Sequence, residues 1–198
     1  MTPENVIPTY EKVGATWARD RSARLMEKRW LDRMMNLAPR NAGAVRVLDL
    51  GCGSGRPIAS YLAERGAVVT GVDATETLST LFASVVPNAE SIRADMRGLS
   101  LNRTFDAILA WDSFFHLCAD DQRAMFATFA AHAAPRAALM FTSGHLAGEV
   151  VGSVADEPIY HASLDPEEYR NLLAENGFEV ISYTPEDPTC GDHTIWLA

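Results

Sequence analysis

Three glycines lie where a strand-like run of residues gives way to a helix, and their spacing suits a closely bound ligand. The stretch VLDLGCGSG, residues 47–55, carries Gly51, Gly53 and Gly55 at alternate positions. Glycine permits positive φ angles and lets a ligand approach the backbone. The pattern alone is weak evidence, because the dinucleotide fingerprint G-x-G-x-x-G needs glycine where Arg56 stands.

Three carboxylates near the ends of apolar runs fit a ligand that contains a ribose, a purine and an amino group. Asp73 can accept hydrogen bonds from both hydroxyls of a ribose, or it can cap the following helix, although Thr75 also suits that role. Asp95 can accept from an exocyclic amine while Met96 covers the purine face. Asp49 can anchor the glycine loop or receive an ammonium group, and both interpretations stay open.

A second group of residues could contact whatever reacts with this ligand. His116 lies in AWDSFFHLCADD, residues 110–121, and is either a general base or a histidine of the pocket wall. Phe114 and Phe115 are expected to be one core residue and one pocket wall. Cys52 has no evident partner base, so we expect it to pack rather than react.

The long connection over residues 144–163 predicts a lid or hairpin over the reacting partner. The chain's histidines lack the short spacing of metal ligands, so no metal site is predicted. The candidate residues of the acceptor pocket are Trp17, Phe115, His145, Glu149, Tyr160 and His161.

The elements that must position these residues alternate regularly from residue 45 onwards. Apolar runs predict strands at VRVLDL, AVVTGVD, ESIRADM, FDAILAW and AALMFTS, with helices between most of them. Asp165 and Pro166 begin a later helix that Gly177 ends. FEVISYT and HTIWLA then lie too close together for a crossover helix, so this pair is expected to be antiparallel.

These elements predict an α/β fold, a doubly wound sheet of seven strands with an antiparallel last strand. Ligands of such sheets bind at the carboxyl ends of the strands. Residues 16–38 predict one charged amphipathic helix upstream. We therefore divide the chain into an N-terminal helical cap segment, residues 1–40, and a ligand-binding domain, residues 41–198.

Charge and composition exclude several classes of partner. The net charge is −9, and residues 144–198 hold one basic residue against eleven acidic ones, which argues against nucleic acid. The acidic end is either a solvated face or a lure for a cationic substrate. No apolar run approaches a membrane span, and the N-terminus does not resemble a signal peptide. Three scattered cysteines predict reduced thiols and a cytoplasmic protein.

Four motifs in order resemble those of class I S-adenosylmethionine-dependent methyltransferases: VLDLGCGSG, VTGVD, RADM and FDAILAWDSFFHL. The resemblance implies the Rossmann-like methyltransferase fold and S-adenosyl-L-methionine as cofactor. It also implies a set of cofactor-binding residues, namely Asp49, Gly51, Cys52, Gly53, Ser54, Gly55, Asp73, Ala74, Asp95, Met96, Arg97, Trp111 and Asp112.

The expected reaction is methyl transfer to a small-molecule acceptor through O, N, S or C. The N/D-P-P-Y-like motif of base and amide methyltransferases is absent after the fourth strand, which lowers nucleic acid and glutamine targets. Arg19 or Arg21 could meet the methionine carboxylate or be solvated. An NAD-dependent oxidoreductase and a non-catalytic S-adenosylmethionine-binding module are the alternatives. The glycine spacing and the final hairpin disfavour the first, and the polar acceptor-side loop disfavours the second. The oligomeric state is left open.

Overall fold

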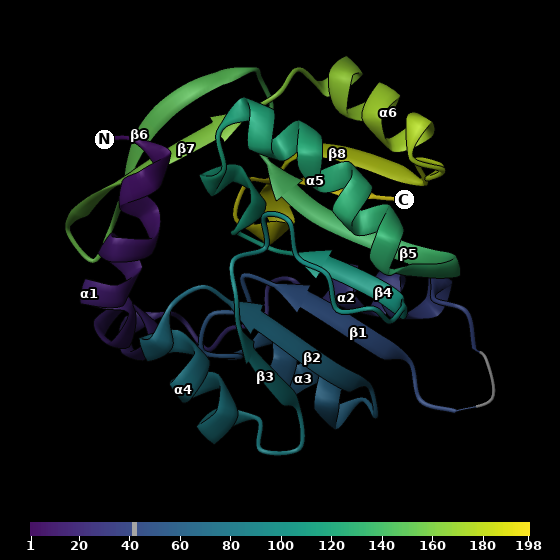
Figure 1. Cartoon of the computed structure of the whole chain (residues 1–198), viewed down its shortest axis with the longest axis horizontal. Coiled ribbons are helices and arrows are strands. Elements are labelled where there is room, and N and C mark those ends of the chain that lie inside the picture. Colours follow the sequence, from purple (N-terminus) through teal and green to yellow (C-terminus); the bar gives the residue numbers. More distant parts are fainter. Residues whose placement is uncertain (41–42) are drawn as a thin grey trace.

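A computed structural model describes residues 1–40 and 43–198, and its centre is a seven-stranded sheet of order β3-β2-β1-β4-β5-β9-β8 (Figure 1). Strands β1 to β5 run parallel, and β9 is antiparallel to both of its neighbours. The predicted doubly wound sheet with its reversed last strand is therefore confirmed. The strands are β1 (Arg46–Leu50), β2 (Val68–Asp73), β3 (Glu90–Arg93), β4 (Phe105–Ala110), β5 (Ala133–Ser143), β8 (Ser182–Asp187) and β9 (His193–Leu197).

Helices cover both faces of this sheet and bury a separate apolar core on each. The cores follow from alternation within the strands, since Val47 of β1 joins one core and Leu48 and Leu50 join the other. The first core contains residues of α2 (Lys28–Leu37), α3 (Ile58–Glu64) and α4 (Glu76–Val85), and the second contains residues of α5 (Ala119–His132) and α6 (Pro166–Glu175).

The helix ends follow the capping residues that the sequence predicts. Thr75 accepts a hydrogen bond from Leu78 N at the start of α4, and Asp165 accepts one from Glu167 N at the start of α6. Gly177, with φ of +81°, ends α6. These caps fix where β2 and β7 hand over to the helices that follow.

The predicted single helix over residues 16–38 is wrong, because the structure has two helices with a bend between them. The first, α1 (Val6–Asp20), begins ten residues earlier than expected, and α2 follows it. In the bend, Ser22 Oγ accepts from Arg24 N, and the Arg21 guanidinium donates to Arg56 O and Glu27. These contacts replace the helical hydrogen bonds that propensity favours.

Two strand boundaries also differ from the prediction. The FEVISYT strand begins only at Ser182, because Phe178 N donates to Leu173 O at the end of α6. The fifth strand begins at Ala133, four residues before the predicted AALMFTS. The predicted segment boundary after residue 40 adjoins residues 41–42, which lie outside the described part of the chain.

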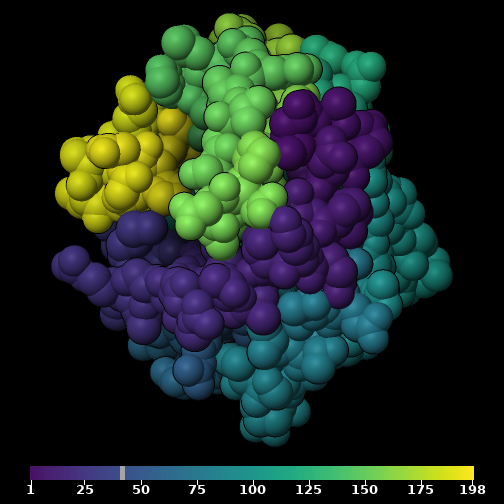
Figure 2. Space-filling view, turned by 90° about the vertical axis from the view of Figure 1, so that its left-hand side faces the viewer, coloured from purple at the N-terminus to yellow at the C-terminus, as the bar shows by residue number. Residues whose placement is uncertain are grey.

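Residues 144–163 contain a two-stranded hairpin apart from the main sheet, as the sequence predicts. Its strands β6 (Gly148–Val154) and β7 (Glu157–Ser163) pair antiparallel. Figure 2 shows the green hairpin lying beside the purple N-terminal segment on one face of the molecule. Among the described residues, no helix has both the length and the apolar content to cross a membrane.

Candidate functional site

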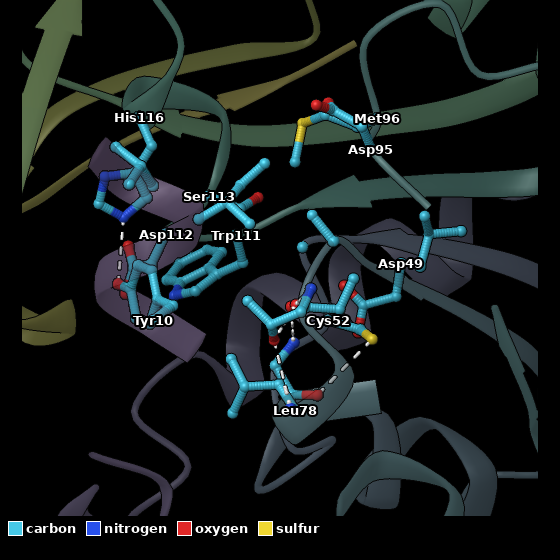
Figure 3. A pocket seen from close by; sticks show the side chains of 18 of the residues that line it. Tyr10, Asp49, Cys52, Leu78, Asp95, Met96, Trp111, Asp112, Ser113 and His116 are labelled. Atoms are coloured by element: carbon cyan, nitrogen blue, oxygen red, sulfur yellow. Dashed lines mark hydrogen bonds between the residues drawn. The ribbon is translucent and has the colours of Figure 1, made fainter. Parts of the chain in front are cut away.

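A cavity opens at the carboxyl ends of β1, β2 and β4, with α1 across it (Figure 3). This is the place where the sheet order reverses, and it is where open α/β sheets bind ligands. The structure places most of the predicted cofactor residues in its wall, namely Asp49, Gly51, Cys52, Gly53, Asp73, Ala74, Asp95, Met96, Arg97, Trp111 and Asp112.

The glycine loop has the backbone that the sequence predicts. Gly51, Gly53 and Gly55 have φ of +70°, +55° and +80°, a region that favours glycine. A Cβ on Gly51 would lie 2.2 Å from the Ser113 side chain, and one on Gly53 would lie 3.1 Å from the Trp17 ring. The loop is therefore held tightly between β4 and α1.

Ser54 and Gly55 are not in the wall of this cavity, contrary to the predicted cofactor set. Both are buried, and Gly55 faces the core, where an added Cβ would lie 2.9 Å from Phe82 and Val86. Glycine at this position allows the loop to pack against α4.

Asp73 connects the glycine loop to the start of α4. Its Oδ2 accepts from Gly53 N at 3.1 Å, and its Oδ1 accepts from Thr75 N at 2.9 Å and from Thr75 Oγ1 at 2.8 Å. Both readings of this residue thus have support in one side chain, which braces the local turn and also borders the cavity. Burial raises its pKa despite these hydrogen bonds.

Asp49 is buried at the end of β1, and no hydrogen bond to its carboxylate occurs within the described residues. The structure therefore does not show the loop anchor that the sequence left open. Burial, together with the nearby Asp73 charge and against the nearby Arg21, raises the pKa of Asp49 to about 7. A ligand ammonium group would supply the missing donor.

Asp95 and Met96 lie on the side of the cavity beyond β3. Arg97 holds the Asp95 carboxylate through its backbone N at 2.9 Å and its Nη2 at 2.6 Å, and it also reaches Asp121. A purine amine at Asp95 would share this carboxylate with Arg97. Cys52 is largely buried, and burial raises its thiol pKa well above the usual range, as expected for a packing residue.

His116 is buried at the opposite side of the cavity, where it joins α1 to the hairpin. Its Nδ1 lies 2.9 Å from Tyr160 O, and its Nε2 lies 3.1 Å from the Tyr10 hydroxyl (Figure 3). A carbonyl oxygen only accepts, so Nδ1 carries the proton and Nε2 accepts from Tyr10. Burial lowers the pKa of His116 to about 4, so the imidazole is neutral at pH 7.

A second cavity adjoins the first along Tyr10, Trp17, Arg21 and Asp112, which line both. The structure places four of the predicted acceptor residues in its wall, namely Trp17, Phe115, His145 and His161. Phe114 is fully buried in the core, so the predicted split between the two phenylalanines is confirmed.

Glu149 and Tyr160, predicted for the acceptor pocket, lie outside the wall of either cavity. Side chains alternate along β7, so His161 faces the second cavity while Tyr160 packs in an apolar cluster with α1. Glu149 is exposed on β6.

Two residues of the site were missed as site residues. Tyr10 lies in α1, and its spacing of seven from Trp17 is the only sequence signal for a shared helix face. His193 of β9 stacks on Trp111, and its Nε2 lies 3.0 Å from Asp112 Oδ1. Burial disfavours the cation, but hydrogen bonds to Asp112 and to Cys190 O outweigh it and raise the pKa of His193 to about 9. No sequence spacing indicates this ion pair.

Arg21 is fixed at the border of the two cavities. Its Nη1 donates to Arg56 O at 2.9 Å, its Nη2 donates to Glu27 at 3.1 Å, and its guanidinium lies 5.7 Å from the centre of the Trp17 ring. Arg19 instead pairs with Asp20 on the surface. Of the two arginines, only Arg21 is placed to meet a ligand carboxylate.

The fold and the site define an α/β domain that can hold a nucleoside-type cofactor and a separate acceptor. In the described ranges, no three His, Cys, Asp or Glu residues are grouped as a metal site would require. The buried indole N–H of Trp111 has no partner there either, so the cavity offers an unused donor beside the unused Asp49 carboxylate.

A family model described as a methyltransferase domain matches residues 22–183. The chain therefore belongs to this family, that of the class I S-adenosylmethionine-dependent methyltransferases, and the predicted resemblance is confirmed.

Solved structures show the same fold over nearly the whole chain. CalS10 from Micromonospora echinaspora, an amino pentose methyltransferase with bound S-adenosylmethionine, is 21% identical, with 96% of each chain covered and a TM-score of 0.71. Magnesium protoporphyrin IX methyltransferase from Synechocystis PCC 6803 is 19% identical, with 98% of this chain and 95% of that chain covered and a TM-score of 0.69.

One curated relative, from Geobacillus sp. (strain WCH70), is named provisionally as a methyltransferase and is 41% identical over 64 residues. The match covers 25% of this chain and 26% of that protein. The chain therefore aligns with about a quarter of the length of this relative.

Proposed function

We propose that this protein transfers the methyl group of S-adenosyl-L-methionine to an O–H or N–H group of a small molecule. The observation that carries the proposal is the pair of joined cavities, one lined by the methyltransferase motifs and the other by aromatic and titratable side chains. Similar structures include CalS10 and the glycopeptide N-methyltransferase MtfA, so amino sugars are the first acceptors to test.

The residues of the first cavity fit the cofactor group by group. Asp49 would receive the ammonium group, Arg21 the carboxylate, and Asp73 the ribose hydroxyls, while Met96 would cover the adenine. The bound cofactor supplies an already activated methyl group. The protein then has to orient the acceptor and exclude water, and such positioning can supply roughly 7–11 kcal/mol of the barrier.

His116 and Tyr10 would act on the acceptor. The Nε2 lone pair accepts a hydrogen bond from the Tyr10 hydroxyl, so a proton leaving the acceptor can reach Nε2 directly or through the phenol oxygen. Burial raises the pKa of Tyr10, which keeps the phenol protonated. Both groups are thus neutral and ready to accept from an uncharged nucleophile.

Calorimetric titration with S-adenosylhomocysteine tests the cofactor assignment, with NAD as the competing ligand. S-adenosylhomocysteine should bind and raise Tm, whereas NAD should do neither. Asp73→Asn should weaken binding by about tenfold to a hundredfold, because the amide brings donors where hydroxyls need acceptors.

The control variant is Thr75→Ala, which disturbs the same turn but keeps the carboxylate. It should lose far less affinity than Asp73→Asn. Binding of NAD in place of S-adenosylhomocysteine would refute the methyltransferase proposal, and equal losses in both variants would mean that Asp73 only braces the turn.

The role of His116 is tested with His116→Asn. The asparagine amide can still donate to Tyr160 O, but it has no nitrogen lone pair at the position of Nε2. Turnover, followed as S-adenosylhomocysteine formed with amino sugars and small hydroxyl compounds, should fall by about 10²–10⁴ with cofactor affinity unchanged. Unchanged turnover would reduce His116 to a wall residue.

A further inference from the structure

Helix α1 and the β6–β7 hairpin form one structural unit, which we call the lid unit (Val6–Asp20 and Gly148–Ser163). Val6 of α1 is buried against Val154, Ile159, Tyr160 and Ala162 of the hairpin in an apolar cluster separate from the two cores of the sheet. Lys12 Nζ also donates to Glu157 at 2.7 Å across the same junction. The two segments thus pack against each other through a small core of their own.

The lid unit meets the sheet domain along the start of α4. Gly14 of α1 lies so close that a Cβ there would be 3.1 Å from Leu78 Cγ. Three residues earlier, Glu11 reaches over the end of α4. Its Oε2 accepts from Glu76 N at 2.8 Å, and its Oε1 accepts from Thr77 Oγ1 at 2.8 Å and from Thr77 N at 3.3 Å.

The first amides of α4 are therefore satisfied from two different parts of the chain. Thr75, the helix's own N-cap, accepts from the third amide, of Leu78, and Glu11 accepts from the first two. Glu11 is exposed, so water can replace its carboxylate at these amides when the lid unit moves away. A contact of this kind can form and break repeatedly without leaving a buried polar group unpaired.

The contact lies where it controls the cofactor cavity. Residues Asp73 to Thr75, which lead into α4, line that cavity, and so does Leu78. Tyr10, next to Glu11 in sequence, bonds to His116, and Trp17 lies against Gly53. Fixing α1 at Glu11 therefore holds both side chains over the ligand sites. Residues 6–20 also lie outside residues 22–183 that the family model matches.

We propose that Glu11 is a positioning residue that latches the lid unit to the amino end of α4, and that opening this latch releases the spent cofactor. The identity of the ligand released rests on the proposed function. The latch itself does not, because its hydrogen bonds join protein groups only.

Glu11→Gln and Glu157→Gln form a matched pair for the test. Each neutralises one exposed carboxylate of the lid unit, but only Glu11 contacts α4, whereas Glu157 pairs with Lys12 inside the lid unit. Hydrogen exchange is measured first, on ligand-free protein. Amides of residues 6–20 and 148–163 should exchange faster together in Glu11→Gln, with Tm nearly unchanged, and should keep the parent's rates in Glu157→Gln.

Release is then measured with radiolabelled S-adenosylhomocysteine chased by unlabelled ligand. A lost cap costs an amount that corresponds to about a two- to thirtyfold faster dissociation from Glu11→Gln, with Glu157→Gln like the parent. Faster exchange confined to residues 74–78 would show a local helix cap and overturn the proposal, as would parental dissociation from Glu11→Gln. If the parent fails to bind S-adenosylhomocysteine, the proposed function fails, and hydrogen exchange alone decides the latch.

Discussion

The carboxylate of Asp49 is enclosed at the end of β1 and receives no hydrogen bond from the described residues. A buried carboxylate without donors favours its proton, and its pKa rises to about 7. A cation placed beside it reverses this preference. The residue can therefore couple the binding of an ammonium group to the release of a proton.

S-adenosylhomocysteine binding should accordingly strengthen as pH rises from 6 to 8, with a proton released on binding at the lower end. Calorimetry in two buffers with different ionisation enthalpies measures this release. In Asp49→Asn both the release and the pH dependence should disappear. A release that persists in the variant would assign the proton to another group.

The same residue makes a prediction for the free protein. The pKa of Asp49 is higher in the folded state than in the unfolded state, so the folded state binds more protons between about pH 4 and 7. The free energy of unfolding should therefore lose the contribution of Asp49 as pH rises through this range. Urea titrations of the parent and Asp49→Asn at several pH values would show the difference narrowing or widening as stated only if this residue titrates there.

At the scale of elements, the ends of strands were predictable and the contacts of helices were not. The glycine loop, Asp73 and Asp95 follow strands whose apolar runs are short and whose neighbours are parallel, so their side chains meet at one sheet edge. Tyr10 and Arg21 reach the same cavity through the bend after α1. That bend depends on tertiary contacts to Arg56 and Glu27, which no local pattern records.

The hairpin separates the acceptor cavity from the cofactor cavity in a way that truncation can test. Ile159 and His161 line only the second cavity. Replacing residues 149–161 by a short Gly-Ser linker should therefore abolish methyl transfer and weaken S-adenosylhomocysteine binding only modestly, through loosening of α1. Circular dichroism provides the control for folding. Complete loss of cofactor binding in a folded variant would show that the hairpin is needed for the first cavity as well.

At the scale of the whole molecule, composition and alternation predicted the class of fold, including the reversed β9. They did not predict that α1 and the hairpin share an apolar cluster, because Val6 and Ile159 are remote in sequence and belong to elements that each look surface-exposed. The acidic C-terminal part also contributes Asp192 and His193 to the second cavity, where His193 offsets the charge of Asp112. The two readings of that acidic part, solvation and attraction of a cation, both remain compatible with this placement.

The four tryptophans divide by location into two kinds. Trp17 and Trp111 line the cofactor cavity, whereas Trp30 and Trp196 are buried in the two cores of the sheet. Indole emission depends on the polarity and motion of its surroundings, so the first pair can respond to a ligand while the second pair supplies a constant background. The protein thus carries its own optical reporter of occupancy, and Trp17→Phe and Trp111→Phe would separate the signal of the moving helix from that of the fixed strand end.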